Sequence, residues 1–191
     1  MPQVFNPAVL TNQGIALLNK AQAGQCKIEF IKMAVGSGSY ATSEKTVSAL
    51  QARTALKAEK NSYKLISKKL KTENSVQLTA MISNQDPLTL ETLVTTGYYI
   101  NEIALYAKES GTADSTAVIY SIAVVSGANG DFMPPYNGHN PAQITQDFIV
   151  TVSNSSTVVV NVAGQALPRS EFEALGLSVK DGKVVQTIIN K

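Results

Sequence analysis

The sequence has very little of the residues that build most catalytic and metal sites. Its 191 residues include one histidine, His139, and one cysteine, Cys26. A single cysteine cannot form an internal disulfide, and these two residues cannot supply the four ligands of a structural zinc site. A triad or a Cys-His pair would depend on His139, which lies in a turn-like Asn-Gly-His-Asn-Pro stretch. We therefore expect no enzyme activity, no metal and no cofactor, unless a symmetric oligomer gathers several copies of His139.

Charge and long apolar runs are scarce as well. Charged residues make up 16% of the chain and its net charge is +2, too small to indicate a nucleic-acid binder. There is no run of about 18 apolar residues, so we expect no membrane insertion. The start, MPQVFNPAVLTNQG, shows neither the basic nor the apolar region of a secretory signal, which predicts a protein made in the cytoplasm. Hydrophobic residues, at 44%, are enough for a real core.

The apolar pattern predicts a β-rich chain with few helices. An N-terminal helix is expected at residues 11–23, with Thr11 as its N-cap and Gly24 after its end, and a weaker second helix at residues 46–57. The breaker-rich residues 126–141 read as a loop. Strands are expected at residues 27–35, 62–70, 76–83, 97–107 and 117–125, followed by a hairpin of residues 148–152 and 157–162. The best fit is an α+β, β-rich fold built on an antiparallel sheet or sandwich.

The last residues form a second unit. Residues 1–165 are predicted to be one domain and residues 166–191 a tail, with a short helix at residues 168–175. Asp181-Gly182 then separates two short strand-like runs, a strong hairpin signal. A hairpin this small is marginally stable alone, so its apolar residues need a cover. We expect the tail to be an oligomerisation or docking element that makes contacts through Val184, Val185 and Ile188.

Glu102 is the residue most in need of explanation. It interrupts GYYINEIALYA, residues 97–107, a stretch whose two strand faces are both mainly apolar and therefore buried. A buried carboxylate must find hydrogen bonds or a cation. It is either a general acid or base, or a residue that holds the structure together. No second catalytic group is evident, so the structural interpretation is favoured.

Two polar segments have ordinary interpretations. Gly36-Ser37-Gly38-Ser39 lacks the ending of a P-loop and the spacing of a dinucleotide site, so it reads as a tight turn. A local basic cluster suits a nucleic acid or an acidic partner or, more simply, a solvated face. Its members are Lys57, Lys60, Lys64, Lys68, Lys69 and Lys71.

The loop segment DFMPPY is a candidate contact surface. Apolar residues in a long, proline-stiffened loop indicate either docking onto another protein or packing on the loop's own domain. The candidate residues are Phe132, Met133, Pro134, Pro135 and Tyr136.

The order of several segments resembles a known family. The helix LTNQGIALLNKAQAG leads into KIEFIKMAVGSG, then INEIALYA, AVIYSIA and DFIVTVSNSSTVVVNV. Together they resemble the N-terminal domain of phage tail-collar fibre proteins, found also in tail fibres of contractile phages and phage-tail-like particles. The resemblance covers roughly residues 4–163, with Ala104 where glycine is common and Gly36-Ser37-Gly38 at the family's GxG turn.

The resemblance implies a structural virion protein. Such domains attach a fibre or receptor-binding protein to baseplate or tail proteins, and such fibres are typically homotrimers. It also implies that Glu102, Gly36 and Gly38 hold the fold. Residues 166–191 are too few for a fibre shaft and tip, so we expect a short attachment protein or a truncated chain. The alternatives are a carbohydrate-binding module or adhesin, which the absence of tryptophan disfavours, and a hydrolase.

Overall fold

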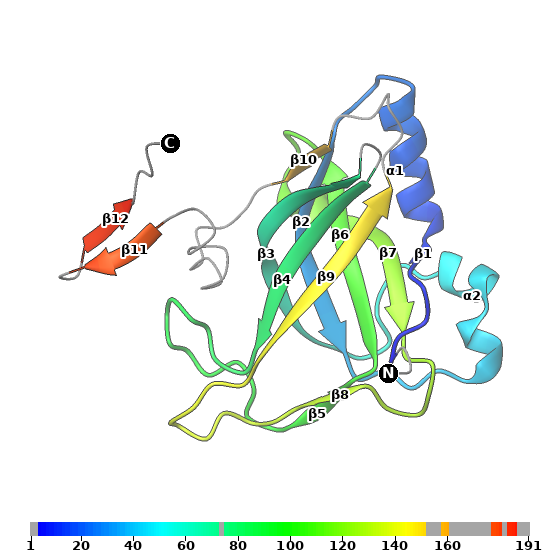
Figure 1. Ribbon diagram of the computed structural model, residues 1–191. Coiled ribbons are helices and arrows are strands. Elements are labelled where there is room, and N and C mark those ends of the chain that lie inside the picture. Colours follow the sequence, from blue (N-terminus) through cyan, green and yellow to red (C-terminus); the bar gives the residue numbers. More distant parts are fainter. Residues whose placement is uncertain (1–3, 73–74, 152–157, 161–176, 181–182, 187–191) are drawn as a thin grey trace.

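The main element of the fold is one curled sheet of eight strands (Figure 1). The computed structural model describes residues 4–72, 75–151, 158–160, 177–180 and 183–186. Within them the strand order is β1-β7-β6-β2-β3-β4-β9, and β10 pairs with β2 beside this path. The strands are β1 (Val9–Leu10), β2 (Ile28–Gly36), β3 (Glu59–Thr72), β4 (Ser75–Ser83), β6 (Glu102–Glu109), β7 (Val118–Val124), β9 (Gln143–Thr151) and β10 (Val158–Val160).

The long strand β3 carries the curl of the sheet. Its first half, residues 59–64, pairs with β2, while its second half, residues 65–72, pairs with β4. Register shifts in both pairings bend the strand, as β-bulges do. The concave side therefore encloses one core, to which the two ends of the sheet both contribute. Its members include Phe30, Leu65, Leu78, Ile103 and Phe148.

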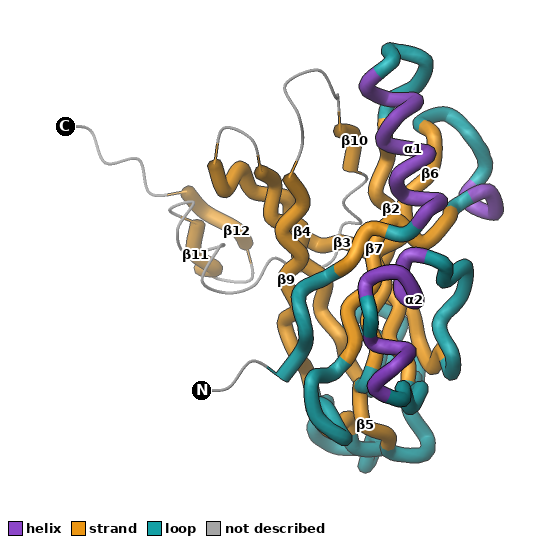
Figure 2. The backbone as a smooth tube through the Cα atoms, turned by 90° about the vertical axis from the view of Figure 1, so that its right-hand side faces the viewer, coloured by secondary structure: helices purple, strands orange, loops and turns teal. Residues whose placement is uncertain are grey.

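Two helices pack on the part of the sheet formed by β7 and β1 (Figure 2). Helix α1 (Asn12–Gln22) begins at Thr11, whose hydroxyl accepts from the amide of Gly14 at 2.9 Å. A side chain at Gly14 would collide with the backbone of Tyr120, so glycine lets α1 cross β7 closely. The short α2 (Val47–Gln51) buries Leu50 on the outer face of the sheet. Two 3-10 turns, η1 (Thr42–Lys45) and η2 (Asp114–Thr116), complete the helical segments of the described chain.

The second helix is shorter than the sequence pattern predicts. The expected helix over residues 46–57 ends at Gln51. The backbone amides of Lys57 and Ala58 donate to the side chain of Glu102 at 2.8 and 2.7 Å, which a continuing helix would not permit. A distant hydrogen-bond acceptor thus overrides a weak local helical pattern.

The single strand expected at residues 97–107 is in fact two strands. Asn101 separates β5 (Tyr98–Ile100) from β6, because its amide donates to the carbonyl of Gly36 and its carbonyl accepts from Val125. β5 leaves the main sheet and pairs with β8 (Asp131–Met133), inside the region expected to be only loop. The small β5–β8 sheet lies at one end of the curled sheet (Figure 1).

The hairpin expected at residues 148–162 does not form. β9 pairs with β4 along nine residues in regular register, while β10 pairs with β2, and in parallel. The sheet is therefore antiparallel except for this pair, and it curls instead of forming a two-sheet sandwich. The long match between β9 and β4 outweighs the local turn composition between β9 and β10.

The C-terminal hairpin expected from the sequence is present. β11 (Leu177–Lys180) and β12 (Lys183–Gln186) pair antiparallel in a separate two-stranded sheet. The expected helix at residues 168–175 and the turn residues 181–182 lie outside the described residues. In the described part of the chain, no helix combines the length and the apolar character that a membrane crossing needs.

Candidate functional site

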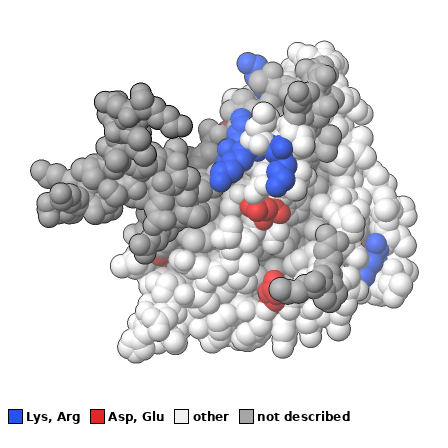
Figure 3. Space-filling model, in the orientation of Figure 1, with Lys and Arg blue, Asp and Glu red and all other residues white. Residues whose placement is uncertain are grey.

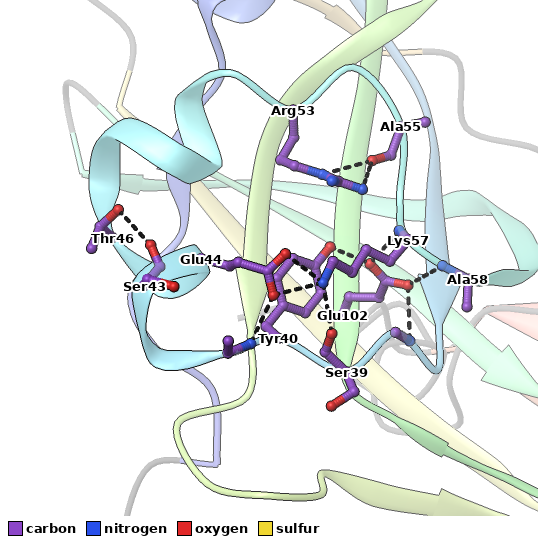
Figure 4. Close-up of polar contacts among 12 residues, drawn as sticks. Ser39, Tyr40, Ser43, Glu44, Thr46, Arg53, Ala55, Lys57, Ala58 and Glu102 are labelled. Atoms are coloured by element: carbon purple, nitrogen blue, oxygen red, sulfur yellow. Dashed lines mark hydrogen bonds and ion pairs between the residues drawn. The ribbon is translucent and has the colours of Figure 1, made fainter.

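The carboxylate of Glu102 lies at the centre of a buried polar cluster (Figure 4). Glu102 begins β6 and is 0% exposed. Its Oε1 accepts from the amides of Gly38 at 3.0 Å and Ala58 at 2.7 Å. Its Oε2 accepts from the amide of Lys57 at 2.8 Å and from the hydroxyl of Tyr40 at 2.5 Å. The carboxylate thus joins β6, the loop after β2 and the loop before β3.

Tyr40 and its neighbours form the outer layer of this cluster. Burial, and then the hydrogen bond to Glu102, raise the pKa of the Tyr40 hydroxyl well above its usual range, so it remains a proton donor. The ammonium of Lys57 lies 4.8 Å from the centroid of the Tyr40 ring, and Arg53 lies 5.8 Å from it. Lys57 also contacts Glu44 at 2.6 Å, and this contact lowers the pKa of the Glu44 carboxyl. The ammonium of Lys57 is thus paired with Glu44, and only its backbone amide contacts Glu102.

Gly36 and Gly38 leave the space that the carboxylate occupies. A Cβ at Gly38 would lie 2.6 Å from Glu102 Oε1 and 2.6 Å from Lys57 Cβ. A Cβ at Gly36 would lie 2.6 Å from the carbonyl oxygen of Ala58. Real Cβ contacts are not this short, so the loop and the carboxylate fit together only because both positions are glycine.

This arrangement is suited to binding the chain's own loops. Each oxygen of Glu102 already accepts two hydrogen bonds, and neither has contact with solvent. A general acid or base needs access to a substrate proton. Among the described residues, no group of three or more metal-ligating side chains is present either.

The β5–β8 sheet divides the candidate contact residues into a buried and an exposed set. Met133 is 0% exposed and lies in the core, and Pro134 and Tyr136 are half-buried. Phe132 is 51% exposed and Tyr99, its cross-strand partner, is 45% exposed. Their ring centroids are 5.1 Å apart with a 58° tilt. With the exposed Pro135, they form what we call the aromatic patch.

His139 and the lysines of β3 lie on the surface. His139 is exposed, and its amide donates to the side chain of Asn137 at 3.0 Å, as in a solvated turn. The lysines of β3 are exposed, and Figure 3 shows cationic side chains gathered on one part of the face beside acidic ones. Of the tail residues, Val184 and Val185 lie in β12, and Ile188 lies outside the described residues.

Sequence reasoning missed several members of both features. Besides the amide of Gly38, the donors to Glu102 are the hydroxyl of Tyr40 and the backbone amides of Lys57 and Ala58. A backbone amide has no signal in the sequence that would single it out. Tyr99 was expected on a buried strand face and instead points outward. Its neighbour Gly97 could have indicated the close approach, since a Cβ there would lie 2.6 Å from the Phe132 ring.

Comparisons with known proteins place this geometry in context. The model of the family described as phage tail-collar fibre protein, N-terminal, matches residues 1–163. No curated protein and no solved structure is similar enough to match. The matched residues include every strand of the curled sheet, the Glu102 cluster and the aromatic patch.

Proposed function

Because the chain belongs to the phage tail-collar fibre protein family, we propose that it attaches a tail fibre or receptor-binding protein to the baseplate or tail of a phage or phage-tail-like particle. Membership of the family makes it a structural protein of a phage tail. The observation that carries the proposal is the match over residues 1–163, which includes the whole curled sheet. Attachment by protein–protein contact is the finer role that we add to this.

The Glu102 cluster supports a non-enzymatic role. Its one buried carboxylate is fully engaged with backbone amides and a tyrosine hydroxyl, so it shapes two loops and has no free face for a substrate. We propose that Glu102, Gly36 and Gly38 are structural residues. Their proposed role is to hold the loops of the attachment domain rigid.

The aromatic patch is the contact surface that we propose for a tail protein. Its exposed rings contact each other on a small sheet whose opposite face, including Met133, is in the core, so the patch is held rigidly. Exposed aromatic residues on a rigid support are typical of contact hot spots. Pro134, Pro135 and Tyr136 continue the same segment. We further propose a homotrimer in which the tail, through Val184, Val185 and Ile188, contacts its neighbours.

Particle assembly tests the attachment function. Tail particles assembled with the wild-type chain are purified by sedimentation, and the bound chain is quantified by immunoblot. We expect the double variant Tyr99→Ser, Phe132→Ser to stay folded and to be incorporated at least tenfold less. Leu88→Ser is the matched control, since Leu88 is an equally exposed loop residue, at 59%. Absence of the wild-type chain from the particles contradicts the proposed function.

A carbohydrate-binding role has one observation in its favour, the pair of exposed rings. The 58° tilt gives no shared flat platform for a sugar ring, so protein contact is favoured. A glycan array with the wild-type chain and the same double variant distinguishes the two roles. Specific glycan binding that the double variant loses would favour the carbohydrate-binding alternative.

A further inference from the structure

Strand β9 is a long edge strand of the curled sheet. It pairs with β4 over residues 143–151, and among the described residues no strand pairs with its other edge. The outward amides and carbonyls of an edge strand are a template on which another extended backbone can pair along its length. A partner that pairs with this edge must therefore present an extended backbone.

The register identifies which groups face outward. The amide of Asn84 donates to the carbonyl of Ala142 at 3.2 Å, so Ala142 faces β4. In a regular antiparallel ladder every second residue does the same, which leaves Thr145, Asp147 and Ile149 with amides and carbonyls directed outward. The side chain of Gln146 donates to the carbonyl of Asp147 at 2.9 Å, in agreement with an outward carbonyl.

Apart from the charge of Asp147, this edge lacks the features that usually protect edge strands. The sequence of β9, QITQDFIVT, contains no proline, lysine or glycine. The opposite edge of the sheet is different. Strand β1 has only two residues, and the segment before it contains Pro7, which cannot donate a hydrogen bond. Of the two edges, as far as the described strands go, β9 is the one open to a new strand.

A groove runs beside the outer edge of β9. It has a volume of about 380 Å³ and lies between residues 146–149 and residues 4–8, the two ends of the curled sheet. Ile103, Ala123 and Phe148 line it and are nearly fully buried. Ile149, at 57% exposed, flanks it. Aliphatic side chains from an added strand would enter this groove at alternate positions.

We propose that the β9 edge binds an extended strand donated by another tail protein, with aliphatic residues at alternate positions and a cationic residue beside Asp147. The inference rests on the proposed attachment function. A second copy of β9 fits less well, because β9 carries no cation and an antiparallel pair centred on Asp147 brings two carboxylates together.

Amide hydrogen exchange on the full chain is the first test. The probe is a soluble synthetic nine-residue peptide in which valine alternates with lysine or threonine. We expect the amides of Thr145, Asp147 and Ile149 to exchange fast in the free chain and at least tenfold more slowly with peptide. Two peptides N-methylated along one edge or the other serve as controls, and we expect one of them not to protect these amides.

If the chain's own residues or a second copy covered the β9 edge, amide exchange would show a different pattern of protection. Protection in the free chain at every concentration means that the chain's own residues cover the edge, and protection that rises with chain concentration means that a second copy does. Either result overturns the inference. So does the absence of protection at millimolar peptide.

Particle assembly separates this inference from the proposed function. Ile149→Pro removes one outward amide, and Ile149→Thr keeps that amide while shortening the side chain. With exchange of the β4 amides as the folding check, we expect the proline variant to be incorporated at least tenfold less and the threonine variant within threefold of wild type. Incorporation of a folded proline variant at the wild-type level overturns the edge inference alone. Particles without the wild-type chain overturn the attachment function. Should Ile149→Pro not fold, the N-methylated peptides decide.

Discussion

At the scale of single residues, Glu102 connects segments that are far apart in the sequence. Its partners Tyr40 and Gly38 follow β2, while Lys57 and Ala58 precede β3, and all of them donate to one carboxylate. Hydrogen bonds to a charged group are stronger than those between neutral groups. Removing the carboxylate would leave all these donors without an acceptor. A buried donor that loses its acceptor destabilises the folded state.

Replacing Glu102 by alanine tests this role. We expect Glu102→Ala to lower the free energy of unfolding by roughly 2–4 kcal/mol, because buried donors are left unsatisfied. Urea denaturation followed by circular dichroism measures it. Glu109→Ala is the matched control on the same strand, since Glu109 makes only a surface ion pair with Lys20, worth at most about 1 kcal/mol. Equal effects of the two substitutions would contradict the structural role.

Gly38 offers a second test of the same cluster. A Cβ at this position would lie 2.6 Å from both Glu102 Oε1 and Lys57 Cβ, so Gly38→Ala must displace the loop. We expect a loss of about 1–3 kcal/mol in thermal or urea unfolding, as for an overpacked core. At Gly127 a Cβ would meet nothing within 4 Å, so Gly127→Ala should change stability little. An unchanged free energy of unfolding for Gly38→Ala would show that the loop can accommodate a Cβ at this position.

At the scale of elements, the β5–β8 sheet has one face in the core and one in solvent. Tyr98, Ile100 and Met133 are buried, while Tyr99 and Phe132 are exposed. The chain reaches this arrangement by leaving the main sheet at Asn101, whose side chain also accepts from the amide of Gly130 at 3.0 Å. Because neighbouring residues of a strand face opposite sides, stability and contact are carried by different residues of the same short strands.

Neighbouring substitutions in β8 should therefore have opposite effects. Met133→Ala removes a side chain that is 0% exposed and should cost about 2–5 kcal/mol in urea unfolding. Phe132→Ala removes a side chain that is 51% exposed and should cost about 1 kcal/mol or less, while reducing incorporation into particles. A large stability loss with Phe132→Ala would mean that its ring supports the fold instead of contacting a partner.

At the scale of the whole molecule, buried and half-buried tyrosines make stability depend on alkaline pH. Burial raises the pKa of Tyr63, Tyr98 and Tyr106, and raises that of Tyr120 to about 12. In the unfolded chain a tyrosine titrates near pH 10, so the folded state holds these protons more tightly. Their contribution to stability is complete below about pH 10 and is lost as the pH rises through the folded values.

We expect the free energy of unfolding to fall between pH 10 and pH 12, measured by urea denaturation at each pH. Absorbance at 295 nm should show the buried tyrosines ionising together with unfolding. Tyr120→Phe is the control, because phenylalanine cannot ionise and the variant should lose less stability over this interval. Stability that stays constant over the same interval would contradict the burial of these hydroxyls.

The tail gives a prediction about assembly. The two-stranded β11–β12 sheet is too small to be stable by itself, so it needs a partner surface. We expect the full chain to be a homotrimer, and deletion of residues 166–191 to weaken or abolish the trimer while the curled sheet stays folded. Light scattering gives the mass and circular dichroism checks the fold. A monomeric full chain, or a trimer of unchanged stability without the tail, contradicts the proposal.

Elements whose evidence is local could be identified from the amino-acid sequence. Thr11 and Gly24 marked the two ends of α1, and alternation identified β2, β4 and β7 within a few residues. The sequence also indicated that Glu102 is buried and needs partners, since both faces of its stretch are apolar. These features depend on residues that are near one another in the sequence. The periodic pattern of apolar and polar side chains therefore indicates them.

Which distant segments meet could be seen only in the folded chain. The break at Asn101, the pairing of β9 with β4 and of β10 with β2, and three of the four donors to Glu102 all depend on backbone amides and carbonyls. Every residue except proline carries both groups, so no residue type marks the ones that will pair. Side-chain alternation tells which face of a strand is buried, whereas the neighbour of each strand edge follows from how the whole sheet curls around its core.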